Sequence, residues 1–190
     1  MKRIMILISA GTGLLFGLFL FLYYKTSMGI WKTLAITAGT ICYHFVIRLL
    51  VGYVYLIVKR NQADYMQKWY RTHTWEQRLY RRLKVKNWKA KMPTFDPDTL
   101  NPELHSWDEI AQAMCQAELV HETNMILSFL PVVASVWFGA FWVFMITSFA
   151  GACLDGCFVI MQRYNRPRVI KIARIEQNKD KKEENKKEQE

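Results

Sequence analysis

Long apolar runs alternate with polar, mostly basic segments along this chain. The first run, Met5 to Tyr24, has twenty residues and no charge, which is about the length of a helix that crosses a 30 Å hydrocarbon layer. The second run, Trp31 to Val58, is longer and is interrupted by Lys32, His44 and Arg48. Each run therefore predicts one transmembrane helix.

The third run, Ile126 to Met161, has thirty-six residues and Asp155 as its only charge. A single helix of that length would extend about 54 Å, far more than a bilayer requires. Two spans that turn near Gly139 to Trp142 fit better, and a shallow re-entrant hairpin is the alternative. The pattern predicts an all-α integral membrane bundle of about four transmembrane helices plus a cytoplasmic amphipathic helical segment.

This pattern divides the chain into four parts. Two N-terminal transmembrane helices occupy residues 1–58, and a basic cytoplasmic helical segment follows at 59–124. Residues 125–162 form the other two spans or the re-entrant hairpin. Residues 163–190 combine a basic interface motif with a charged tail that is either disordered or a solvated extension of the helix.

Lysine and arginine predict the orientation of the spans. Eleven basic residues lie between Lys59 and Glu122, and ten lie from Arg163 onward. Basic residues collect on the cytoplasmic side of a membrane, so both termini are expected in the cytoplasm. The net charge of +10 suits attraction to anionic lipid headgroups. With four spans, membrane lipids are the expected partners of this charge, and nucleic acid is not.

The cytoplasmic segment contains two predicted helices. Trp75, Leu79 and Leu83 share one side of a helix suited to the membrane surface, and the stretch Arg78 to Lys91 carries seven basic residues and no acidic one. The second helix follows a proline-rich loop. It begins at Ser106, where Glu109 three residues on completes a capping box.

Glu118, His121 and Glu122 lie on one face of that second helix. A Glu-x-x-His pair ligates metal in di-metal bundles, but such sites need a second pair, which this chain lacks, so no metal is expected. In acyl transfer, a carboxylate instead orients a histidine that takes a proton from a hydroxyl. An interfacial helix with polar residues facing water is the alternative without chemistry.

Three ionisable residues lie within the predicted spans: His44, Arg48 and Asp155. Such residues cost free energy at membrane depth, so they usually face the bundle interior and pair or bind something. A structural ion pair between Arg48 and Asp155 is one expectation, and a functional site is the other.

The stretch "QRYNRPR" follows the last span and is richer than a stop signal requires. Guanidinium groups suit phosphate or carboxylate in bidentate geometry, and Pro167 is expected to end the helix at Arg166. The stretch predicts one wall of a polar headgroup site. Its candidate residues are Gln162, Arg163, Tyr164, Asn165, Arg166 and Arg168.

Together with "AELVH" at residues 117–121 and "WEQRLYRRLKVKNWKAKMP" at residues 75–93, this stretch resembles the glycosyl-4,4'-diaponeurosporenoate acyltransferase family. Members of that family add a fatty acyl chain to the glucose of a glycosylated carotenoid. The resemblance runs from about Trp69 to Arg174 and adds further candidate binding residues, which are Glu76, Trp88, Lys89 and Lys91.

The resemblance implies a multi-pass acyltransferase of a bacterial cytoplasmic membrane that acts on a glycosyl carotenoid or another glycolipid. His121 is the expected general base and Glu118 its orienting carboxylate. No cofactor is expected, and acyl-CoA or an acyl carrier is the expected donor. Two alternatives remain: a non-enzymatic lipid-binding scaffold or accessory protein, and a metal-dependent enzyme with Glu118 and His121 as ligands.

Overall fold

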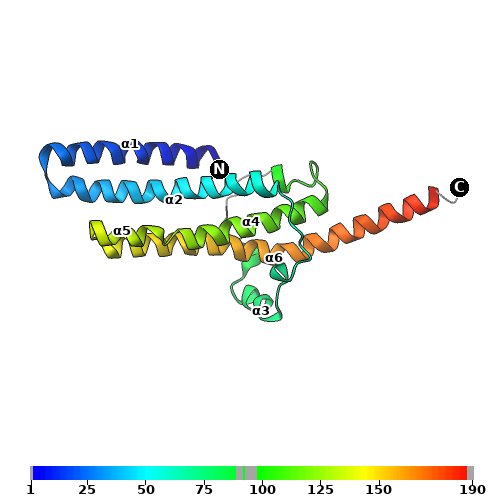
Figure 1. The fold of residues 1–190 in the computed structure, drawn as a ribbon. Helices are drawn as coiled ribbons and strands as arrows, with labels where there is room; N and C mark the ends of the chain where they lie inside the picture. Colours follow the sequence, from blue (N-terminus) through cyan, green and yellow to red (C-terminus); the bar gives the residue numbers. More distant parts are fainter. Residues whose placement is uncertain (1, 89–91, 93–97, 188–190) are drawn as a thin grey trace. The chain divides into compact units, whose positions relative to one another are not determined.

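The structure is a computed structural model that describes residues 2–88, 92 and 98–187. These residues are helical or irregular, with no strand among them (Figure 1). The helices, in chain order, are α1 (Lys2–Thr26), α2 (Gly29–Lys59), η1 (Lys68–Tyr70), α3 (Thr74–Arg82), η2 (Val85–Asn87), η3 (Asp98–Leu100), α4 (Trp107–Leu127), α5 (Leu130–Phe138) and α6 (Phe141–Lys187).

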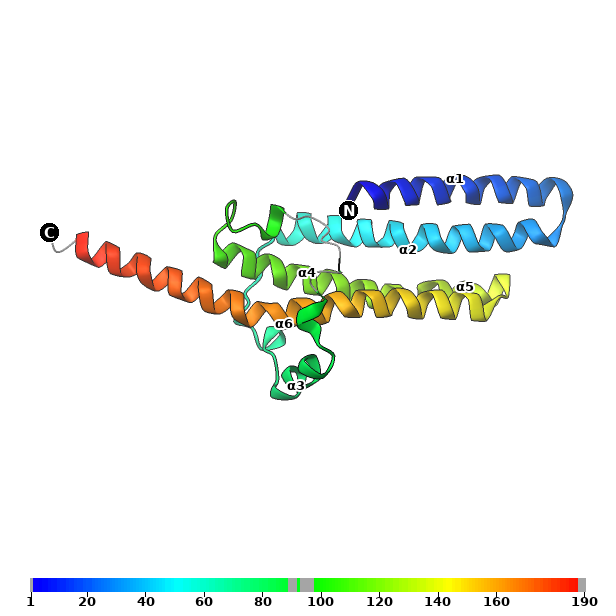
Figure 2. The same cartoon turned by 180° about the vertical axis from the view of Figure 1, so that it is seen from behind.

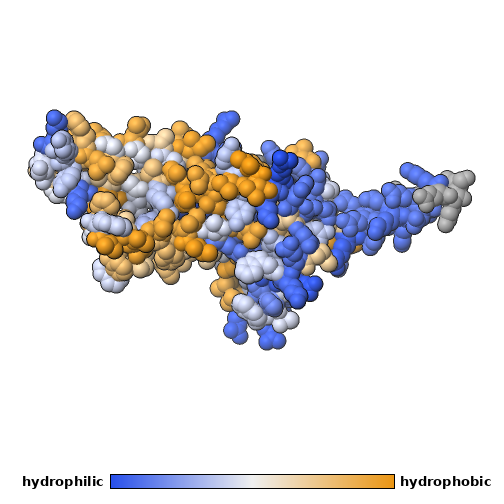
Figure 3. Space-filling view, viewed as in Figure 1, coloured by the Kyte–Doolittle hydropathy of each residue, from blue (hydrophilic) through white to orange (hydrophobic). Residues whose placement is uncertain are grey.

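Four helical stretches of the described residues are long and apolar enough to cross a membrane. They are α1, α2, α4 together with α5, and α6. No residue of α1 is buried, and Figure 3 shows an apolar surface over α1 and α2. Apolar side chains exposed along whole helices suit lipid rather than water. The predicted all-α fold with four such helices is confirmed.

The chain divides into two compact units, which are described separately below. The first unit comprises Met1–Val54 and Val120–Cys157, and the second comprises Tyr55–Leu119 and Phe158–Glu190. The helices α2, α4 and α6 contribute residues to both units.

In the first unit, α1 and the start of α2 form an antiparallel hairpin, visible in Figures 1 and 2. Ser27, in the left-handed region with φ of 52°, makes the turn. The ring of Phe16 packs on Gly39, where an added Cβ would lie 2.9 Å from the ring. Glycine thus permits the two helices to approach closely.

Pro131 determines where α4 ends in the first unit. Proline has no N–H to donate to the carbonyl four residues earlier, which belongs to Leu127, the last residue of α4. The Tyr43 hydroxyl on α2 donates to that carbonyl instead, at 2.8 Å. A carbonyl without a partner is costly in an apolar environment, so Tyr43 stabilises the break between α4 and α5.

The second turn of the first unit lies within the predicted range. Helix α5 ends at Phe138 and α6 begins at Phe141. Between them Gly139 and Ala140 have φ of 71° and 54°. The left-handed conformation is accessible to glycine at little cost, which explains why the long apolar run folds back here.

In the second unit, the predicted capping box at the start of α4 is confirmed. The Ser106 N–H donates to Glu109 Oε2 at 2.9 Å, and the Glu109 N–H donates to Ser106 Oγ at 3.3 Å. Cys115 of this helix forms a small apolar core with Ala63 and Tyr70. The apolar side of α3 is exposed, as a surface helix requires: Trp75 is 61% exposed.

The expectation that Pro167 ends the helix at Arg166 is wrong. Helix α6 continues through Pro167 to Lys187. A proline inside a helix removes one backbone hydrogen bond, and packing on both sides offsets that loss. Arg166 immediately before the proline and Ala173 after it are both fully buried.

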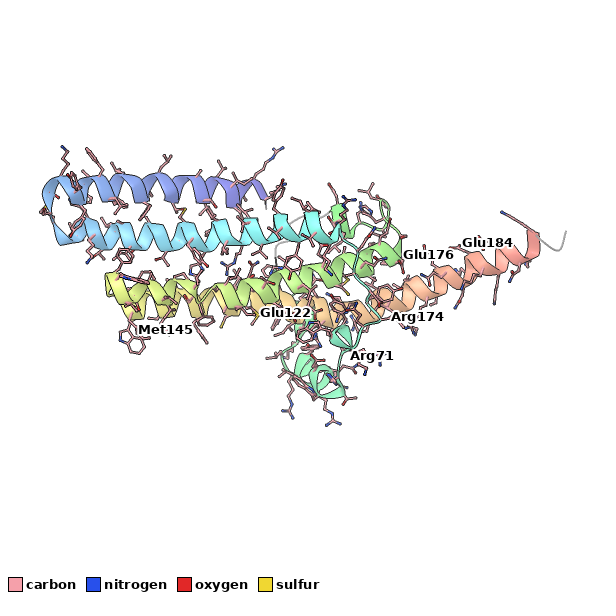
Figure 4. All side chains as sticks on the ribbon, viewed as in Figure 1. Arg71, Glu122, Met145, Arg174, Glu176 and Glu184 are labelled. Atoms are coloured by element: carbon pink, nitrogen blue, oxygen red, sulfur yellow. The ribbon has the colours of Figure 1, made fainter. Side chains whose placement is uncertain are left out.

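The last part of α6 is helical as far as Lys187 and exposed. Figure 4 shows Glu176 and Glu184 on this part of the helix, and Figure 3 shows its hydrophilic surface. Its side chains from Lys179 to Lys182 are exposed. We assign no function to this segment.

Candidate functional site

A buried network of two carboxylates and two guanidinium groups lies in the second unit. Glu118 on α4 is fully buried. Its Oε1 accepts from Arg163 Nη1 at 2.6 Å, and its Oε2 accepts from Arg166 Nη1. Both arginines come from the "QRYNRPR" stretch of α6. The structure therefore brings together the two stretches "AELVH" and "QRYNRPR" singled out in the sequence.

Glu76 on α3 extends this network. Its Oε1 accepts from Arg163 Nε at 2.9 Å and from the Tyr80 hydroxyl at 3.3 Å. Its Oε2 accepts from the His73 N–H at 2.6 Å, which caps the start of α3. One guanidinium thus joins two carboxylates, Glu76 of α3 and Glu118 of α4, that are 42 residues apart in the chain.

Paired charges compensate one another here, which is the condition for burying them. Burial alone raises the pKa of Glu76, but the His73 N–H bond and the Arg163 pair outweigh burial, so the pKa of Glu76 lies below its usual value. Burial and then the Glu76 carboxylate raise the pKa of Tyr80 to about 12. The Tyr80 phenol therefore keeps its proton at neutral pH.

The same two arginines also tie the segment before α3 to α6. Arg163 donates to the carbonyls of Trp69 and Arg71, each at 3.2 Å, and Figure 4 marks Arg71 in this segment. Arg166 is 0% exposed and donates to the Tyr70 carbonyl, with its guanidinium 5.1 Å from the Tyr70 ring centre. These contacts assign Arg166 a role in holding the fold.

The other candidates of the stretch lie around this network. Gln162 is buried and Asn165 is half-buried. The Tyr164 ring packs edge-on against Tyr80, with centres 6.3 Å apart. The Arg168 guanidinium lies 4.6 Å from the Tyr164 ring centre and donates to its hydroxyl at 2.8 Å.

Three further candidates follow α3 in the sequence. Trp88 donates from Nε1 to the Leu83 carbonyl at 3.2 Å, which is a local contact. Lys89 and Lys91 lie outside the described residues.

A second polar cluster lies in the first unit and contains His121. His121 Nδ1 lies 2.9 Å from Asp155 Oδ1. Asp155 Oδ2 accepts from Arg48 Nη2 at 2.6 Å, so the expected Arg48–Asp155 ion pair is confirmed. Arg48 also donates to the His44 carbonyl at 2.6 Å and to Ser128 Oγ at 3.3 Å.

The contact with Asp155 restricts the tautomer of the His121 ring. An ionised carboxylate only accepts hydrogen bonds, so His121 Nδ1 is the donor when Asp155 carries its charge. In the neutral ring the remaining lone pair then lies on Nε2. The Asp155 side chain is 2% exposed and that of His121 is 23% exposed. A buried carboxylate thus holds a partly exposed histidine.

Gly151 on α6 provides room for the Arg48 guanidinium. A Cβ at this position would lie 2.9 Å from Arg48 Nη2 and 3.4 Å from both His44 Nδ1 and Ser128 Oγ. Three side-chain atoms therefore surround the space that any larger residue would need, and glycine keeps Arg48 on Asp155.

We expect Gly151→Ala to destabilise the protein by about 1–3 kcal/mol, the usual cost of overpacking. The guanidinium must move away from Asp155, which weakens a buried ion pair. The thermal unfolding midpoint in detergent measures the effect. Gly17→Ala is the matched control, because nothing lies within 4 Å of a Cβ there; equal midpoints for the two variants would contradict the crowding argument.

Glu118 and His121 each have a partner that spacing along α4 did not suggest. The two oxygens of Glu118 accept from arginines of α6, and the Nδ1 of His121 is beside Asp155. Spacing along one helix identified Glu118 as the nearest carboxylate, whereas Asp155 is 34 residues from His121 in sequence. In the sequence, Asp155 could be singled out only as the one charged residue of the third apolar run.

The described residues offer no cluster of three or more His, Cys, Asp or Glu side chains arranged to hold a metal ion.

The described chain is thus an α-helical protein with four membrane-compatible helices, a buried Glu–Arg network and a histidine–aspartate pair. Residues 66–175, more than half of the chain, match the family model described as glycosyl-4,4'-diaponeurosporenoate acyltransferase, so the chain belongs to this family. The comparisons with curated proteins and with solved structures gave no match. The matched region contains His121, Asp155 and the arginines of the network, and Arg48 precedes it.

Proposed function

We propose that this protein transfers a fatty acyl group from an acyl thioester to a sugar hydroxyl of a glycosylated carotenoid in a bacterial membrane. Family membership supports the reaction and the class of acceptor. The pairing of His121 with Asp155 is the observation that carries the chemistry. The four apolar helices suit an acceptor whose long tail lies in the bilayer.

His121 acts as general base in this proposal. Its Nε2 takes the proton of the sugar hydroxyl while the hydroxyl oxygen attacks the carbonyl carbon of the thioester. The new C–O ester bond forms and the C–S bond breaks. The proton then passes from the His121 imidazolium to the departing thiolate, which leaves as a thiol, so the enzyme returns to its starting state.

Asp155 acts as the positioning residue for His121, a role that local spacing had suggested for Glu118. Its Oδ1 fixes the tautomer and the ring orientation of His121, and its charge stabilises the imidazolium that forms during the reaction. Arg48 holds the other oxygen at 2.6 Å, which keeps the carboxylate from rotating. Glu118 instead supports the fold through Arg163 and Arg166.

The donor is acyl-CoA or an acylated carrier protein, and no cofactor takes part in the proposal. Both donors are anionic and water-soluble, so they reach the protein from the cytoplasm. We accordingly place both termini and the segment Tyr55–Leu119 on the cytoplasmic side, which agrees with the excess of lysine and arginine there.

Mass spectrometry of lipids from cells with and without the gene tests the proposed function. We expect the deletion to remove an acylated glycolipid and to accumulate its unacylated precursor, which would also identify the acceptor. An unchanged lipid profile, with the protein confirmed in wild-type membranes, would favour the lipid-binding scaffold over the enzyme.

Replacements of Asp155 test whether this residue positions His121 or only stabilises the fold. We expect Asp155→Ala to lower kcat about 100-fold with little change in KM, because a misplaced base costs about that factor. Asp155→Asn keeps the volume of the side chain, but its single amide oxygen cannot accept from both Arg48 and His121, so kcat should fall in this variant as well. Steady-state rates of both variants, with their unfolding midpoints, check this; a wild-type kcat for Asp155→Asn, or a change confined to KM, would contradict a positioning role.

A further inference from the structure

We propose that a cleft between α3 and the "QRYNRPR" stretch of α6 binds a phosphate ester, with Arg81 and Arg168 as the charged groups. The identity of the phosphate ester as the acyl donor rests on the proposed function. The cleft has a volume of about 410 Å³ and lies wholly within the second unit. Its lining residues are Thr72, Gln77, Tyr80, Arg81, Arg163, Tyr164, Pro167 and Arg168.

The charged side chains that line this cleft are all arginines. Three arginines line it and no carboxylate does. Arg163 is neutralised by Glu76 and Glu118, which lie behind the lining. Among the described residues, no ion pair is recorded for Arg81 or Arg168, and both are exposed. Two uncompensated guanidinium groups therefore face one cleft.

The neighbouring residues position these groups. The hydroxyl and ring of Tyr164 hold the Arg168 guanidinium, and Tyr164 itself packs on the buried Tyr80. A guanidinium held in this way loses less conformational entropy when it binds an anion. Thr72 and Gln77 add neutral hydrogen-bonding groups to the same cleft.

This combination fits a phosphate ester in size and charge. Guanidinium forks donate two parallel hydrogen bonds to phosphate oxygens, and pockets of about 300–1,000 Å³ accommodate small ligands. Two sources carry this chemistry: the phosphates of a thioester donor such as CoA, and the headgroup of an anionic phospholipid. The arginines thus have two separate roles: Arg163 and Arg166 stabilise the fold, whereas Arg81 and Arg168 bind the ligand.

The test uses the full-length protein in nanodiscs of neutral phosphatidylcholine, with CoA as the probe. We expect Arg81→Gln and Arg168→Gln each to weaken CoA binding about ten-fold, the loss of one charge-assisted interaction. Lys171→Gln is the matched control, because Lys171 is exposed one turn beyond Arg168 and does not line the cleft. The thermal unfolding midpoint confirms that each variant folds.

Nanodiscs that contain phosphatidylglycerol distinguish the two sources. If the cleft takes a lipid headgroup, the wild-type protein enriches phosphatidylglycerol around itself, the two arginine variants do not, and CoA does not bind. Either pattern supports a phosphate-ester site. Equal behaviour of the wild type, both variants and the control, with CoA and with phosphatidylglycerol alike, would overturn it.

This result is separable from the proposed function. His121→Ala should retain CoA binding while it loses acyl transfer. If acyl transfer persists and the arginine variants bind CoA as the wild type does, the proposed binding site is wrong and the proposed reaction stands. If CoA binding depends on the two arginines but the wild-type protein transfers no acyl group, the binding site stands and the proposed reaction is wrong.

Discussion

His121→Ala is expected to reduce the rate of acyl transfer by at least about 100-fold, the lower end of what a general base contributes. Alanine removes the imidazole that takes the proton of the acceptor hydroxyl in the proposed reaction. The His121 side chain is partly exposed, so its loss should leave the fold intact. The measurement is the formation of acylated glycolipid by membranes with equal amounts of protein.

His105→Ala is the matched control for this experiment. His105 is exposed just before α4 begins and lies 3.6 Å from Glu109 in the first turn of that helix, so its replacement should leave acyl transfer at the wild-type rate. Wild-type activity of the His121→Ala protein would remove the proposed base and favour the scaffold. Equal losses in both histidine variants would indicate a general effect on folding or insertion.

Glu118→Gln is expected to destabilise the protein by about 3–5 kcal/mol, the cost of removing one partner of a buried ion pair. Both oxygens of Glu118 accept from guanidinium groups. A glutamine can offer one acceptor oxygen, and its amide would direct N–H groups toward the second arginine. The thermal unfolding midpoint in detergent and the amount of protein in the membrane measure the loss.

Glu184→Gln provides the control for this loss of a carboxylate, because Glu184 is exposed on the last part of α6 (Figure 4). It should unfold at the wild-type temperature. The same pair of variants decides between two roles for Glu118. If Glu118→Gln unfolds at the wild-type temperature but transfers acyl groups slowly, Glu118 orients His121. If it unfolds at a lower temperature and keeps normal activity per folded protein, Glu118 stabilises the fold through Arg163 and Arg166.

The linear sequence was sufficient for the helical architecture. Uncharged runs of about twenty residues cannot form a water-soluble surface, and only helices satisfy their own backbone within a membrane. The break at Gly139, the cap at Ser106 and the outward side of α3 follow from the conformational properties of a few residues. These are local effects, so the order of residues along the chain contains them.

Pro167 marks the limit of such local reasoning. Proline alone favours the end of a helix, yet α6 continues through it. The backbone hydrogen bond lost at one position is offset by burial of Arg166 and Ala173 on either side. That burial depends on residues distant in sequence, which no local rule contains.

The candidate sites were also determined in two stages. Composition identified the residues that are costly to bury, namely His121, Glu118, Asp155 and the arginines of "QRYNRPR". Tertiary packing alone decided their partners, because a carboxylate is stabilised by whichever cation the fold brings within hydrogen-bond distance. Sequence therefore determined which side chains need a partner, and the packing of distant helices determined that Asp155 holds His121 and that Glu118 holds two arginines.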